Sequence, residues 1–140
     1  MNFMDWNDGY SVGITEIDDQ HKHLVNLVNK LHEAMMAKRS TEVLSEVISQ
    51  LIEYTGVHFA TEEQLFARFS YPDTAPHVAE HQKFVESVET FYKDFQNKRI
   101  GVSIDILNFL TDWLKNHILG SDKKYGPFIT EKLQGLTADR

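Results

Sequence analysis

Apolar residues recur with helical spacing along most of the chain, and no stretch alternates between apolar and polar residues for long enough to predict a β-strand. Clusters of polar residues, glycine and proline divide this pattern into four amphipathic segments. The segments predict helices at about 18–40, 41–71, 74–97 and 103–119. A short helical turn is expected at about 128–133, after Gly126 and Pro127. The chain is therefore predicted to be all-α.

Individual residues predict where these helices begin and end. Asp18 is expected to cap the start of the first helix, because aspartate side chains accept hydrogen bonds from the free N–H groups there. Pro72 ends the second helix, since proline disfavours helical backbone in the residue before it. Residues 97–101 close the third helix, and Gly120 marks either the end of the fourth helix or a distortion within it.

The connections between the predicted helices are short, and short connections favour antiparallel neighbours. The expected architecture is an up-down-up-down four-helix bundle at 18–120, with an N-terminal arm at 1–17 that lies across it and a C-terminal segment at 121–140. A chain of 140 residues with 41% hydrophobic content can build one sizeable core. We therefore expect a single domain.

The composition narrows the classes of function. A formal net charge of -7 argues against nucleic acid or an anionic membrane as a partner, because both attract a basic surface. The chain has no cysteine, so disulfides, thiolate metal sites and a cysteine nucleophile are excluded. The first residues do not resemble a secretory or transit signal, and no apolar run is long enough to span a membrane. A cytoplasmic location is expected.

Seven histidine and acidic side chains occupy helical positions that suit metal binding. They are His21, His58, Glu62, His77, His81, His117 and Asp122. His58 and Glu62 are four residues apart, and so are His77 and His81. Residues at this spacing share a helix face, with Cβ atoms about 5–6 Å apart. Each pair is therefore placed to bind one ligand jointly.

The other three candidate residues need separate arguments. His21 shares a helix face with Leu24 and so belongs to the core-facing stripe of the first helix. His117 and Asp122 are five residues apart, which places them about 140° out of phase on a regular α-helix. Both can point inward only if the helix breaks or forms a π-type bulge, which Gly120 is expected to permit.

All seven side chains converge at one end of the predicted bundle, because the starts of the first and third helices meet the ends of the second and fourth. Imidazole and carboxylate ligands suit iron, manganese, zinc or copper. Seven ligands are too many for one ion, so the site is expected to be dinuclear. Two octahedral ions bridged by both carboxylates and by one oxo or hydroxo group would keep one open position, which suits a small diatomic ligand.

The residues around these positions resemble the hemerythrin family, in particular its single-domain bacteriohemerythrins. The resemblance lies in IDDQH at 17–21, HFATEE at 58–63, YP at 71–72, HVAEH at 77–81, WLKNHI at 113–118 and Asp122. It extends from Trp6 and Val12 in the arm to Tyr125, which is nearly the whole chain. Such a set of five histidines and two acids is highly specific.

The resemblance implies a non-haem di-iron centre, bridged by carboxylates and an oxo or hydroxo group, that binds dioxygen reversibly. One iron would be held by His77, His81 and His117. The second iron would be held by His21 and His58, would be five-coordinate and would take the dioxygen. Both ions would be bridged by Glu62 and Asp122.

The resemblance also supplies residues for an apolar oxygen pocket. These are Leu24, Phe59, Trp113, Leu114 and Ile118. The same residues also fit ordinary core packing, and the two interpretations are compatible. Phe66 stands where the family often has methionine, which bears on the packing beside Glu62 but on no ligand.

Four further polar residues near the candidate ligands are not expected to bind metal. His23 is two positions from His21 and points elsewhere, and His32 lies about 16 Å further along the helix axis. Glu63 and Glu80 are expected to face solvent, as most charged side chains do.

Three classes of function stay open. The leading hypothesis is an oxygen-binding protein, not an enzyme, that serves storage, transport or delivery to an oxygen-consuming protein partner. The alternatives are a di-iron peroxidase or oxidase with the same ligands, and a sensing module that acts through a partner. An iron-storage role would show as iron loading beyond two ions. A monomer is favoured.

Overall fold

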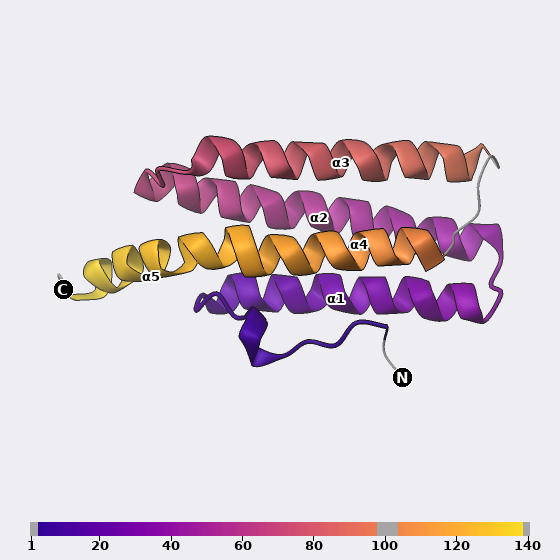
Figure 1. Ribbon diagram of the computed structural model, residues 1–140, viewed down its shortest axis with the longest axis horizontal. Coiled ribbons are helices and arrows are strands. Elements are labelled where there is room, and N and C mark those ends of the chain that lie inside the picture. Colours follow the sequence, from indigo (N-terminus) through magenta and orange to yellow (C-terminus); the bar gives the residue numbers. More distant parts are fainter. Residues whose placement is uncertain (1–2, 98–103, 139–140) are drawn as a thin grey trace.

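Four long helices run in alternating directions and form an antiparallel bundle (Figure 1). They are α1 (Thr15–Met36), α2 (Thr41–Phe69), α3 (Thr74–Gln96) and α4 (Ile104–His117). The computed structural model describes residues 3–97 and 104–138, and no β-strand occurs among them. The predicted all-α, up-down-up-down four-helix bundle is confirmed. The predicted loop at 98–101 and the predicted helix start at 103 lie outside the described residues.

The start of α1 differs from the prediction. The helix begins at Thr15, ahead of Asp18, so the prediction that Asp18 is its N-cap is wrong. The Asp18 carboxylate instead accepts hydrogen bonds from the Ser11 hydroxyl at 2.5 Å and from the Val12 amide at 2.9 Å, which ties the arm to the first turn. The helix also ends earlier than expected, because Lys38 has a left-handed backbone with φ of 53°.

The ends of α2 agree with the predicted breaker residues. Ser40 is the N-cap, and its side chain accepts a hydrogen bond from the Val43 amide at 3.3 Å. At the other end Ser70 has a left-handed backbone with φ of 54°, and the Tyr71 amide folds back to the last turn. The turn before Pro72 therefore sets the position from which α3 starts.

The fourth helix does not end near Gly120. It passes into a π-helical turn, η2 (Ile118–Asp122), and then into α5 (Lys123–Ala138). Of the two alternatives for Gly120, a distortion within the helix is therefore the one found.

The short helical turn predicted at 128–133 is wrong in length, because α5 has 16 residues and contains Pro127. Tyr125 and Ile129 are fully buried on this helix. Burial of each such side chain contributes about 1.5–3 kcal/mol, which outweighs the one backbone hydrogen bond that a proline removes. Pro127 itself lies at an exposed position.

Buried apolar side chains form two separate clusters. The main core consists of Met4, Tyr10, Leu24, Val25, Leu27, Val28, Leu31, Val47, Ile48, Leu51, Phe59, Phe84, Val88, Phe95, Leu107, Leu110, Leu114 and Ile118. The end cluster consists of Val12, Ile14, Ile17, Phe66, Tyr71, Tyr125 and Ile129. Along α1, His21 lies between Ile17 of the end cluster and Leu24 of the main core. The candidate ligands therefore occupy a polar layer with apolar side chains on both sides.

The N-terminal arm packs beside α1 and contains a short 3-10 turn, η1 (Asp8–Tyr10) (Figure 1). Its attachment is specific, because the Asn29 side chain bonds both the amide and the carbonyl of Met4 at 2.7 Å. None of the helices in the described parts of the chain is sufficiently long and apolar to cross a membrane.

Candidate metal centre

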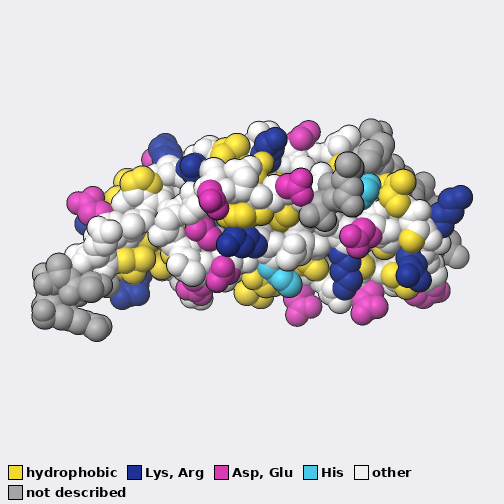
Figure 2. All heavy atoms as spheres, turned by 90° about the horizontal axis from the view of Figure 1, so that it is seen from below, with side chains coloured by type: hydrophobic (Ala, Val, Ile, Leu, Met, Phe, Trp, Pro, Cys, Tyr) yellow, Lys and Arg dark blue, Asp and Glu magenta, His cyan; other side chains and the backbone are white. Residues whose placement is uncertain are grey.

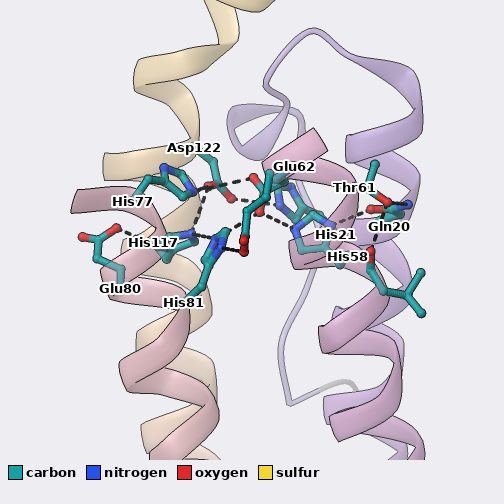
Figure 3. Close-up of polar contacts among 12 residues, drawn as sticks. Gln20, His21, His58, Thr61, Glu62, His77, Glu80, His81, His117 and Asp122 are labelled. Carbon is teal, nitrogen blue, oxygen red and sulfur yellow. Dashed lines mark hydrogen bonds and ion pairs between the residues drawn. The ribbon is translucent and has the colours of Figure 1, made fainter. Parts of the chain in front are cut away.

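The seven predicted histidine and acidic side chains lie together inside the bundle, and each is at most 6% exposed. Figure 3 shows that they come from every helix of the bundle and point toward one another. They are His21 of α1, His58 and Glu62 of α2, His77 and His81 of α3, His117 of α4 and Asp122 of η2.

These side chains form two overlapping groups that could each hold a cation. The larger group consists of Glu62, His77, His81, His117 and Asp122. The smaller group consists of His21, His58, Glu62 and Asp122. Within each group the potential ligand atoms all lie within 4.8 Å of one another. Only the two carboxylates belong to both groups, so they stand between two adjacent positions.

The histidine Nε2 atoms of this layer face the two carboxylates (Figure 3). His21, His77 and His117 place Nε2 at 2.9, 3.0 and 3.0 Å from Asp122 oxygens. His58 and His81 place Nε2 at 3.1 and 3.3 Å from a Glu62 oxygen.

Many of these close atoms lack the alignment of a hydrogen bond. Both oxygens of Glu62 and of Asp122, and the Nε2 atoms of His21 and His77, are buried without a hydrogen-bond partner. The Nε2 atoms of His81 and His117 face each other at 3.2 Å. Buried polar atoms without partners are rare in folded proteins. Imidazoles and carboxylates that converge in this way fit cations placed between them.

The charge state of the two carboxylates suits cation binding. Burial disfavours ionisation of Asp122, but contacts with the imidazoles of His117, His21 and His77 outweigh it and hold the Asp122 pKa well below its usual range. For Glu62, burial and the charge of Asp122 also oppose ionisation, yet contacts with His58 and His81 lower its pKa. Both carboxylates are therefore anions, which is the form that binds a cation.

The π-helical turn explains how His117 and Asp122 act together although five residues separate them. A π-helix closes i→i+5 hydrogen bonds, so residues at this spacing return to one face. The expected π-type bulge is therefore found. Gly120 lies inside this turn, and a Cβ atom at its position would meet nothing within 4 Å, so no close contact requires glycine there.

Three residues that touch the outer nitrogen of a candidate ligand were not identified from the sequence. Gln20 Oε1 lies 2.7 Å from Nδ1 of His58. A Glu63 oxygen lies 3.1 Å from Nδ1 of His81, and a Glu80 oxygen lies 3.1 Å from Nδ1 of His117. The expectation that both glutamates face solvent is only half right, since their side chains are 39% and 48% exposed but their carboxylates reach the rings.

The outer contacts follow a pattern that the sequence does contain. Gln20, Glu63 and Glu80 are each adjacent in sequence to a candidate ligand on their own helix. Each contacts a histidine on the next helix of the chain, from α1 to α2, from α2 to α3 and from α3 to α4. Residues next to a ligand lie beside the adjoining helix in a bundle, and this signal could have identified them.

The end cluster closes the polar layer on one side. Phe66 is fully buried and places its ring edge against His77, with centroids 4.8 Å apart. Phe66, where the sequence departs from the family pattern, lies one helical turn after Glu62 on α2. Burial, followed by the charges of Glu62 and Asp122, raises the pKa of the Tyr125 hydroxyl, so that group stays neutral.

A small apolar cavity of about 20 Å³ lies in the main core near the polar layer. Of the five residues predicted to line an apolar pocket, four do so: Leu24, Phe59, Trp113 and Leu114. Ile118 is buried but is not among the lining residues. The rings of Phe59 and Trp113 also stack on candidate ligands, with centroids 3.7 Å from His81 and 4.4 Å from His117.

The remaining two histidines lie outside the polar layer. His23 is exposed and packs against Tyr54, with ring centroids 4.2 Å apart. His32 stacks on Phe3 of the arm at 4.8 Å. In the described part of the chain, neither belongs to a group that could hold a metal ion.

Comparison with known proteins agrees with this geometry. Residues 12–129 match the hemerythrin HHE cation binding domain. Bacteriohemerythrin of Methylococcus capsulatus is 37% identical over 93% of this chain and 99% of that protein, and bacteriohemerythrin of Stenotrophomonas maltophilia is 35% identical over 95% and 86%. A crystal structure of wild-type hemerythrin superposes with a TM-score of 0.84 at 36% identity, covering 89% of this chain and 96% of that one. The arrangement of the polar layer, the fold and these similarities together show that the chain belongs to the hemerythrin family.

Proposed function

We propose that this chain holds two non-haem iron ions and binds dioxygen reversibly, for storage, transport or delivery. The observation that carries the proposal is the pair of overlapping ligand groups that share Glu62 and Asp122. Two carboxylates common to two groups suit two adjacent ions that they bridge.

The two groups divide the ligand roles. The ion in the larger group would be held by His77, His81 and His117. The ion in the smaller group would be held by His21 and His58. The bridging ligands would be Glu62 and Asp122, which are fully buried and ionised.

The unequal number of histidines in the two groups supports an open coordination position on one of the two ions. Because one group has three histidines and the other has two, and both carboxylates are shared, an ion held by His21 and His58 would be the one with an open position. When bound, the two iron ions would supply one electron each and the open coordination position that dioxygen needs.

The surrounding side chains keep water away from this position. The polar layer lies between the main core and the end cluster, and the cavity beside it is lined mostly by apolar groups. A volume of about 20 Å³ admits one small molecule and little else. A dry surrounding protects a reduced metal site from protons and water that would promote irreversible oxidation.

The small number of anions favours binding over further oxygen chemistry. Only two carboxylates are among the candidate ligands, and fewer anionic ligands favour the ferrous state and disfavour higher-valent iron. The alternative, a di-iron oxidase or peroxidase, is favoured by one observation. A surface cleft of about 150 Å³ reaches His77 and is also lined by Glu80, Ser121 and Lys124, which gives a reductant a place to approach.

The test is an optical spectrum of the anaerobically reduced protein, recorded again after admission of air and once more after removal of oxygen. Iron is counted per chain in the same sample. Two irons and a visible absorption band that appears with air and disappears on deoxygenation are the expected result. A permanent change to the diferric spectrum with turnover of peroxide would favour the enzyme, and a protein that takes up no iron would contradict both.

A further inference from the structure

The outer contacts of the candidate ligands differ in charge between the two sides of the centre. On the larger side, His81 and His117 face the carboxylates of Glu63 and Glu80. On the smaller side, His58 faces the neutral amide of Gln20. The buried Nδ1 of His21 has no hydrogen-bond partner. Anionic partners therefore occur on the three-histidine side only, within the contacts that the structure describes.

The amide of Gln20 is held in one orientation by a neighbouring hydroxyl. Thr61 donates its hydroxyl hydrogen to the Val57 carbonyl at 3.0 Å, so its oxygen is free to accept. The Gln20 Nε2 group donates to that oxygen at 3.2 Å. The opposite end of the amide, Oε1, then faces His58 and accepts the hydrogen on Nδ1. The lone pair of His58 is thereby left on Nε2, which points into the polar layer (Figure 3).

Glu80 makes two contacts that hold the fourth helix. One of its oxygens lies 3.1 Å from Nδ1 of His117 and accepts a hydrogen bond from the Ser121 hydroxyl at 2.5 Å. Ser121 belongs to η2 and precedes Asp122. One carboxylate of α3 therefore fixes the ring of one candidate ligand and the π-helical turn that presents another.

A carboxylate that accepts the Nδ1 hydrogen makes an imidazole a stronger ligand, whereas an amide does so less. A stronger donor favours the ferric over the ferrous ion. The two carboxylates thus act on the larger group only, and they are half-exposed, so solvent reduces their effect without removing it.

We propose that Glu63 and Glu80 are positioning residues that make the three-histidine position the more electron-rich of the two, while Gln20 and Thr61 keep the two-histidine position neutral and correctly oriented. This inference rests on the proposed di-iron function. It assigns to these four side chains outside the ligand set the difference between a position that is filled and a position that accepts a ligand.

The test compares three variants with the full-length protein: Glu63→Gln, Glu80→Gln and Gln20→Glu. Glu89→Gln is the matched control, because Glu89 is exposed on α3 about two and a half turns beyond Glu80 and changes the net charge equally. The first measurement is zinc affinity by competition with a chelator, which does not depend on redox chemistry. We expect Glu63→Gln and Glu80→Gln to weaken zinc binding about tenfold, and Glu89→Gln to leave it unchanged.

The second measurement is the midpoint potential of the iron-loaded proteins in a spectroelectrochemical titration. Glu63→Gln and Glu80→Gln should raise the potential and Gln20→Glu should lower it. A tenfold loss of preference for ferric iron corresponds to about 59 mV for a one-electron step. A merely structural role would lower the melting temperature of the apoprotein, measured in parallel, without these opposite shifts.

The outcomes separate this inference from the function on which it rests. Zinc affinities and potentials equal to those of Glu89→Gln would overturn it, and so would shifts of the same sign in Glu80→Gln and Gln20→Glu. If the protein binds zinc in the expected order of variants but no iron, the proposed function fails and the positioning roles stand. If neither metal binds, both fail.

Discussion

Gly126 lies so close to the main-chain oxygen of Val12 that a Cβ atom on Gly126 would be 2.6 Å from it. The arm therefore rests directly on the backbone of α5, at the level of the end cluster. Since the Val12 amide is also held by Asp18, the arm has little freedom to move away.

We predict that Gly126→Ala lowers the stability of the fold by about 1–3 kcal/mol, the usual cost of forcing extra volume into a packed contact. Denaturant unfolding measures the change. The control is Gly135→Ala on the same helix, where a Cβ atom would meet nothing within 4 Å and a small gain of about 0.4–1 kcal/mol is expected. Equal effects of the two substitutions would contradict the close contact.

Asn29 provides a second anchor for the arm, because its side chain bonds both polar groups of the Met4 backbone. We expect Asn29→Ala to cost about 1–3 kcal/mol, since it leaves these buried groups unpaired. Amide hydrogen exchange at Met4 should accelerate with it. Asn26→Ala, at an exposed position of α1, should change neither quantity.

His21 and His23 are two residues apart on α1, yet only His21 faces the polar layer. We predict that His21→Gln reduces the number of irons per chain below two, while His23→Gln retains both ions. Metal analysis after anaerobic reconstitution measures the difference. Loss of metal from His23→Gln would show that the ligand set is wrong.

Removal of the metal should destabilise the native state. At a free metal concentration 1,000 times the dissociation constant, binding stabilises a protein by about 4 kcal/mol. The melting temperature of the metal-loaded protein should therefore fall when a chelator is added and recover when metal is restored. In Glu62→Gln, which lacks one shared carboxylate, the chelator should have a much smaller effect.

Leu24 lines the apolar cavity, whereas Leu31, two turns further along α1, is buried in the main core away from it. Either leucine-to-alanine substitution should cost about 2–5 kcal/mol. Only Leu24→Ala should accelerate oxidation of the reduced protein in air, because it opens the cavity to water. The rate is read from the growth of the diferric absorption. Equal rates would exclude the cavity from any role in protecting the site.

The helices and the composition of the polar layer could be predicted because they depend on regular spacing. Residues four apart share a helix face whatever surrounds them, so His58 with Glu62 and His77 with His81 needed no tertiary information. The five-residue spacing of His117 and Asp122 predicted a shared face only if the helix contained a bulge between them. The structure has this bulge.

The features that were missed depend on contacts between segments. Asp18 has the right residue type for a cap, but the arm brings the Ser11 hydroxyl and the Val12 amide to its carboxylate. Gly126 and Pro127 were expected to precede a short separate turn, but α5 runs through both of them, with Tyr125 fully buried on it. The charge of Glu80 suggested that its side chain faces solvent, whereas its carboxylate reaches His117 on the adjoining helix.

The π-helical turn η2 contains one residue more than a turn of α-helix, so it changes which side chains before and after it share a face. Leu114, one turn before η2, and Ile118, its first residue, pack in the main core, whereas Tyr125 and Ile129 after it pack in the end cluster. His117 therefore follows one apolar layer and Asp122 follows the other. A substitution that rotates one of the two apolar layers would therefore misalign either His117 or Asp122 and leave the other in place.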